Sequence, residues 1–67
     1  MKPKAKIYKN GWETYFCKTG EVPFPWWYVS VRNAAGEIHD KVRCDDYRAA
    51  LEYFRAFNAI AKNAREG

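Results

Sequence analysis

The chain has 67 residues, a formal net charge of +4, and three Trp, five Tyr and four Phe side chains. This length predicts one domain near the lower limit for a self-sufficient core, with no room for a deep substrate cleft, so some of the rings are needed for burial. The polar, lysine-rich start and the absence of a long apolar run lead us to expect no secretory signal, no membrane contact and a cytoplasmic protein.

Lysines dominate the first nine residues, at Lys2, Lys4, Lys6 and Lys9. We interpret residues 1–5 as a basic arm, which either adds non-specific affinity for nucleic acid through counterion release or serves as a solubilising terminus. Residues 4–8, which overlap this arm, have the pattern of a short first strand. The Asn10-Gly11 pair that follows is typical of a two-residue hairpin turn.

A second strand is predicted from Trp12 to Cys17, with Trp12, Thr14 and Phe16 on one side and Glu13, Tyr15 and Cys17 on the other. We expect Phe16 and Trp12 to be buried. Two prolines and a glycine then predict a loop over residues 18–25. Phe24 lies between two prolines in this loop, so its ring is either tucked over the core edge or displayed to a partner.

Residues 26–43 alternate as two strands joined at Asn33-Ala34-Ala35-Gly36. Side chains alternate along a strand, so two faces are predicted. One face is apolar and contains Trp27, Val29, Val31, Ile38 and Val42. The other combines aromatic rings with cations and contains Trp26, Tyr28, Ser30, Arg32, His39, Lys41 and Arg43.

The period of the apolar residues changes from Asp45 onward and predicts a helix over residues 45–64. Asp45 or Asp46 is suited to be the N-cap. The expected apolar stripe is Tyr47, Ala50, Leu51, Phe54, Phe57 or Asn58, and Ala61. The predicted fold is therefore α+β: one domain over residues 1–67, in which a three- or four-stranded antiparallel meander within residues 6–43 packs against one C-terminal amphipathic helix.

Catalysis and metal binding have little support in the sequence. His39 is the sole histidine, and no nucleophile has a predicted base beside it, so we expect a protein that is not an enzyme and needs no cofactor. Cys17, Cys44 and His39 are fewer than the four ligands of a usual structural zinc site. Two cysteines are also too few for a disulfide scaffold, although a Cys17–Cys44 bridge stays open at this point.

The aromatic and basic face is the best functional clue. Arg32, Lys41 and Arg43 suit phosphate contacts, and Trp26 and Tyr28 offer flat rings to bases or to a protein partner, while Glu13 and Glu37 dilute the positive charge. An ordinary solvated face is the alternative, but an exposed Trp is typical of interface anchors.

The stretch from Trp27 to Asn58 resembles AP2-type DNA-binding domains and the arm-site-binding domains of phage integrases. In each, strand, turn and strand precede an acidic cap and a helix that begins like Asp46-Tyr47-Arg48-Ala49-Ala50-Leu51. The resemblance implies that a sheet enters the major groove of duplex DNA, with contacts from Trp26, Tyr28, Arg32, Lys41 and Arg43. The usual glycine-threonine-phenylalanine stretch before the helix is replaced here by Val42-Arg43-Cys44.

In size and aromatic content the chain is also similar to small phage-encoded inhibitors, including anti-CRISPR proteins. That resemblance implies a protein-binding inhibitor that blocks a host nucleic-acid-processing complex. Its anchors would be Phe24, Trp26, Tyr28 and Tyr53. The leading hypothesis is a non-enzymatic module that docks this face on nucleic acid, with duplex DNA favoured. The protein would be a monomer, or a homodimer that hides the face.

Overall fold

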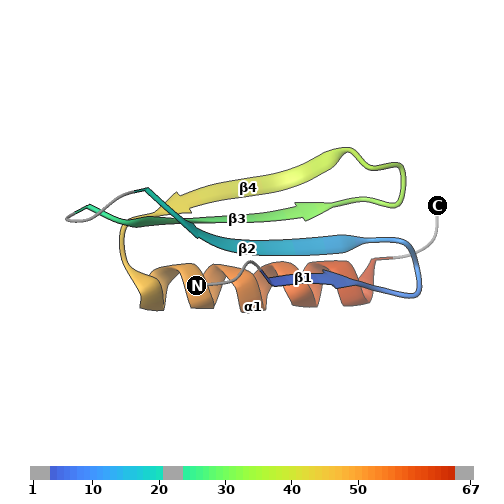
Figure 1. Ribbon diagram of the computed structural model, residues 1–67. Coiled ribbons are helices and arrows are strands. Elements are labelled where there is room, and N and C mark those ends of the chain that lie inside the picture. Colours follow the sequence, from blue (N-terminus) through green and yellow to red (C-terminus); the bar gives the residue numbers. More distant parts are fainter. Residues whose placement is uncertain (1–3, 21–23, 65–67) are drawn as a thin grey trace.

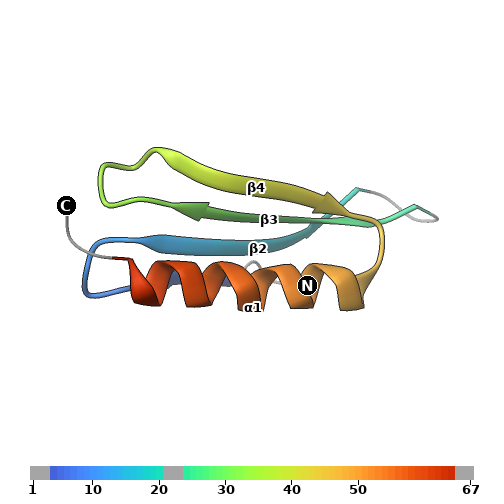
Figure 2. The same cartoon turned by 180° about the vertical axis from the view of Figure 1, so that it is seen from behind.

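The computed structural model describes residues 4–20 and 24–64, in which four strands precede one helix. The elements are β1 (Lys4–Ile7), β2 (Glu13–Thr19), β3 (Trp26–Arg32), β4 (Ile38–Cys44) and α1 (Tyr47–Asn63). Each strand pairs antiparallel with the next, in chain order, so the sheet is a four-stranded meander. The helix lies behind the sheet in Figure 1 and in front of it in Figure 2. The α+β prediction is therefore confirmed, and among the described residues no helix lies over the other face of the sheet.

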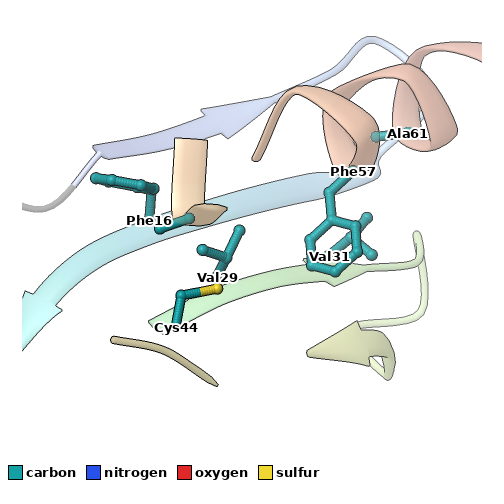
Figure 3. Close-up of a cluster of buried hydrophobic side chains, with 7 residues drawn as sticks. Phe16, Val29, Val31, Cys44, Phe57 and Ala61 are labelled. Carbon is teal, nitrogen blue, oxygen red and sulfur yellow. The ribbon is translucent and has the colours of Figure 1, made fainter. Parts of the chain in front are cut away.

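The core lies between α1 and the face of β2, β3 and β4 that it covers. Phe16, Val29 and Val31 are the largest apolar side chains with almost no exposed surface, and they meet Phe57 and Ala61 from the helix (Figure 3). Burial of a Phe or Val side chain stabilises the fold by roughly 1.5–3 kcal/mol. Because so few residues are fully buried, the fold depends strongly on each of them.

The helix begins as the sequence predicts. Asp46 is the N-cap, and its carboxylate accepts a hydrogen bond from the backbone N–H of Ala49 at 3.1 Å. The predicted apolar stripe faces the sheet through Ala50, Phe57 and Ala61, with Phe54 packed beside them. Tyr47 is partly exposed, yet its ring lies edge-on to Phe16.

The β1–β2 turn and the β3–β4 turn each have a three-residue loop. Tyr8 N–H donates to Trp12 C=O at 2.8 Å, and Asn33 N–H donates to Glu37 C=O at 2.9 Å. Each loop ends in a glycine with positive φ, 88° at Gly11 and 84° at Gly36, which is the geometry of a type I turn followed by a G1 bulge. The prediction of a two-residue turn at Asn10-Gly11 is wrong, because the loop has three residues. Two-residue and three-residue hairpin turns both place a glycine at positive φ, so the Asn-Gly pair alone does not distinguish them.

Strand pairing covers the end of the predicted basic arm, in line with the strand pattern of residues 4–8, and it also covers the first two residues of the predicted loop 18–25. Lys4 and Ala5 pair with Phe16 and Tyr15, so the end of the predicted basic arm is part of β1. Lys18 and Thr19 pair with Trp27 and Trp26, so they belong to β2. The loop begins two residues later than the predicted range 18–25. Residues 1–3 and 21–23 lie outside the described chain, and Lys2 with them.

A β-bulge interrupts the pairing of β3 with β4. Val31 pairs with Asp40 whereas Arg32 pairs with Ile38, which leaves His39 as the extra residue. One extra residue exchanges the two sides of a strand. The prediction that Ile38 shares the apolar face is therefore wrong: it lies on the same side as Arg32 and is 45% exposed.

Candidate binding face

The face of the sheet opposite α1, here called the open face, combines residues from all four strands. Cross-strand partners lie on the same side of a sheet, so the register defines its rows. From one end to the other the rows are Thr19–Trp26, then Cys17–Tyr28–Arg43, then Ala5–Tyr15–Ser30–Lys41, then Ile7–Glu13–Arg32–Ile38. Of the seven predicted face residues, all but His39 are in these rows.

Trp26 and Arg43 form a stack at one end of the open face. The Arg43 guanidinium carbon lies 4.4 Å from the centroid of the Trp26 ring, a cation–π contact. Gly20 makes this placement possible, because a Cβ at Gly20 would lie 2.7 Å from Cδ1 of Trp26. The stack presents a flat ring and a guanidinium together, two groups that interact well with bases and phosphates.

Tyr15 extends the aromatic surface and was missed as a site residue. Its ring centroid lies 6.2 Å from that of Tyr28 on the neighbouring strand. A hydrogen bond with the Cys17 side chain, reinforced by a small desolvation and by the charges of Cys17 and Tyr28, raises the pKa of the Tyr15 phenol. The phenol is protonated at neutral pH and adds no negative charge to the open face.

The charge of the open face is predominantly positive. Arg32, Lys41 and Arg43 contribute cations, and Glu13 is the one acidic residue in the rows described above. Lys41 and Arg43 are two positions apart on β4, which separates their Cα atoms by about 7 Å. Arg43 also lies 3.7 Å from Asp45, but both side chains are mostly exposed, so this pair is weak and leaves the guanidinium accessible.

Other residues predicted to bind are elsewhere. The His39 ring meets Trp12 edge-on, with 5.1 Å between centroids, and Trp12 packs against the core, so His39 does not extend the row of Lys41 and Arg43. Lys4 and Lys6 are paired with core-facing Phe16 and Thr14 and lie on the helix side of the edge strand β1. Tyr53 is on α1, away from the open face, with its ring 6.1 Å from Phe57.

Phe24 is displayed rather than tucked. It is 81% exposed and lines a shallow hollow with Pro25, Arg43 and Asp45. This hollow adjoins the Trp26–Arg43 stack, so the open face continues onto the loop at that end. Of the two positions considered for the Phe24 ring, the structure has the exposed one and not the one packed over the core edge.

The two cysteines are separate free thiols. Cys17 is on the open face of β2, whereas Cys44 is buried on the helix side of β4, with β3 between them. Burial, together with Asp45 and Asp46, raises the pKa of the Cys44 thiol. Among residues 4–20 and 24–64, no three His, Cys, Asp or Glu side chains cluster in a way that could hold a metal ion.

Comparison of the chain with protein families, with curated proteins and with solved structures finds no match. Within the described residues, α1 is not long and apolar enough to cross a membrane. The open face is therefore the feature of the molecule that bears most directly on function.

Proposed function

We propose that the chain is a non-enzymatic binding module that docks its open face on nucleic acid, with duplex DNA as the favoured partner. The observation that supports this most directly is the position of Arg32, Lys41 and Arg43 on the side of the sheet that α1 leaves uncovered. Cations along a sheet attract the phosphate backbone. The Trp26–Arg43 stack and the Tyr15–Tyr28 pair supply surfaces for sugars and bases.

If the AP2-type resemblance holds, the open face is the side of the sheet that enters the major groove. That groove is about 12 Å wide and admits a two-stranded β-ribbon, so β3 and β4, which contain Arg32, Lys41 and Arg43, are the strands expected to enter it. In this orientation α1 supports the sheet from behind and makes no contact with the DNA.

Alanine substitutions at Arg32 and Lys41 test the proposal. Each should weaken binding to duplex DNA and reduce the slope of log affinity against log salt by about 0.9, the value for one phosphate contact. Arg55→Ala is the matched control, because it removes one exposed cation from α1. If Arg32→Ala and Lys41→Ala both bind like Arg55→Ala, the proposal is wrong.

A protein partner is the second candidate, and the exposed apolar side chains favour it. Phe24 is 81% exposed, and Ile7, at the other end of the open face, is 73% exposed. Such side chains are typical of protein interfaces, including those of inhibitors that block a host nucleoprotein complex. Here Trp26→Ala should abolish binding, Lys41→Ala should have little effect, and affinity should respond weakly to salt.

A further inference from the structure

A separate cationic site lies at the opposite end of the molecule from the Trp26–Arg43 stack. A hollow of about 500 Å³ opens between the β1–β2 turn and the C-terminal end of α1, which lie together in Figures 1 and 2. We call it the lysine hollow; its lining residues are Lys6, Tyr8, Lys9, Asn10, Lys62 and Ala64. Lysines from three different segments line it, and no described lining residue is acidic.

The walls of the lysine hollow are held in place by hydrogen bonds. The Asn10 side-chain amide donates to the backbone carbonyls of Ala61 and Ala64 at 2.8 and 2.9 Å, which fastens the turn to the helix end. The Tyr8 hydroxyl donates to the Asn58 side chain at 2.8 Å. Lys6 lies with its ammonium nitrogen 5.2 Å from the Tyr8 ring centroid. The hollow is thus built by fixed backbone and ring positions.

Among residues 4–20 and 24–64, the positive charge at this end exceeds what is needed to offset the helix dipole. The C-terminus of a helix resembles about half a negative charge, which a single lysine such as Lys62 offsets. Asn10 already donates to two of the terminal carbonyls. Lys6 and Lys9 are therefore surplus to any helix-capping role, and their mutual repulsion is relieved when an anion occupies the hollow.

We propose that the lysine hollow binds a phosphate group, either from a nucleic-acid backbone or from a free phosphate compound. Lysine ammonium groups are common phosphate ligands, and the volume is in the range of small-molecule sites. Lys6 is on the helix side of the sheet, so this site is distinct from the open face. The inference does not depend on the function proposed above.

Pyrophosphate is the probe for the first experiment. It is titrated at low salt into the ¹⁵N-labelled full chain while the side-chain amide of Asn10 and the backbone amide of Gly11 are followed by NMR. We expect saturable shifts of these resonances. In Lys9→Gln/Lys62→Gln the affinity should fall by about tenfold or more. In the control Lys18→Gln, which removes an exposed lysine at the end of β2 away from the β1–β2 turn, affinity should be unchanged.

Three results would overturn the inference: no saturable shift, equal affinity in the double variant, or an equal loss in Lys18→Gln. The Asn10 amide resonance also reports whether the double variant keeps its fold. Duplex DNA added to Arg32→Ala/Lys41→Ala then identifies the source of the phosphate. Shifts at Asn10 with DNA indicate backbone phosphate, and shifts with pyrophosphate alone indicate a free phosphate compound. Failure of the hollow is read from the Asn10 and Gly11 resonances. Failure of the open face is read from the DNA affinities of Arg32→Ala and Lys41→Ala.

Discussion

Cys44 is an ionisable residue in the core, and its pKa makes stability depend on alkaline pH. Burial is the main cause that raises this pKa above the ordinary 9.0. The unfolded chain therefore releases the thiol proton at a lower pH than the folded protein does. The stabilisation is complete below about pH 9 and is lost as pH rises from there toward the folded pKa.

The expected result is that the wild-type advantage over Cys44→Ala in unfolding free energy shrinks above about pH 9. Urea unfolding of the two proteins at several pH values between neutral and about pH 10 measures it. Tyrosine and lysine titrations occur in both chains and cancel in the difference. A difference that is constant with pH would show that the Cys44 thiol ionises equally in both states.

Gly20 is a residue whose missing side chain matters for the binding face. Gly20→Ala places a Cβ 2.7 Å from Cδ1 of Trp26, and φ at this position is +82°. We expect the Trp26 indole to move away from Arg43, with a shift of the Trp26 indole N–H resonance in NMR spectra. The left-handed backbone adds a cost on the order of 1–2 kcal/mol in stability.

Gly36→Ala is the matched control for Gly20→Ala. Its φ is +84°, so it has the same backbone strain, but a Cβ there meets nothing within 4 Å. It should lose similar stability and leave the Trp26 resonance in place. If both variants shift that resonance equally, the close approach of Gly20 does not position Trp26.

At the scale of elements, the Asn58 side chain joins α1 to β2 and to Tyr8, the residue that follows β1. Its side-chain oxygen accepts hydrogen bonds from the Tyr8 hydroxyl at 2.8 Å and the Thr14 hydroxyl at 2.6 Å, and Thr14 is fully buried. Asn58→Ala leaves the Thr14 hydroxyl without this partner, so we expect a loss of about 1–3 kcal/mol. Urea unfolding of the variant measures the loss.

Tyr8→Phe is the comparison, because it removes one hydrogen bond at a half-buried position and leaves Asn58 paired with Thr14. It should cost about 1 kcal/mol, less than Asn58→Ala. Equal losses would mean that the buried Thr14 hydroxyl contributes nothing. The comparison separates the attachment of the helix to β2 from its attachment to the residue after β1.

The strands and the helix were predictable where residues adjacent in the sequence determine the local structure. Alternation in Trp26–Arg32 identified the core face of β3, and Asp46 identified the helix start. The bulge at His39 was not predictable, because it arises from the pairing of two strands and not from the composition of either. It moved Ile38 to the open face and His39 away from Lys41.

The candidate sites follow the same division. The cations and rings of β3 and β4 were found because their spacing along one segment sets their face. Tyr15 was missed as a site residue because its contact with Tyr28 requires the β2–β3 register. The lysine hollow was missed as well, since Lys6 and Lys62 meet only after the helix has packed on the sheet.

At the scale of the whole molecule, the fold is an elongated two-layer structure of 42 × 18 × 16 Å, with the helix on one side of the sheet (Figures 1 and 2). Its two long faces differ: the open face presents rings and cations, and the other is occupied by α1. If DNA lies on the open face, the solvent exposure of lysines should change on one side of the sheet only. Lys41 and Lys18 test this, since both are exposed and both are in strands. Lys41 is on the open face, whereas Lys18 pairs with the helix-facing Trp27 and is on the other side.

Acetylation of the protein with and without duplex DNA at low salt measures that change, with mass spectrometry of the modified peptides. With about nine-tenths of the protein bound, Lys41 should react about tenfold more slowly, because only the free tenth is accessible there. The Lys18 rate should be unchanged. Raising the salt concentration should restore the Lys41 rate, because it releases DNA held by phosphate contacts. Equal protection of both lysines would indicate diffuse binding over the surface, and no protection of Lys41 would contradict docking through the open face.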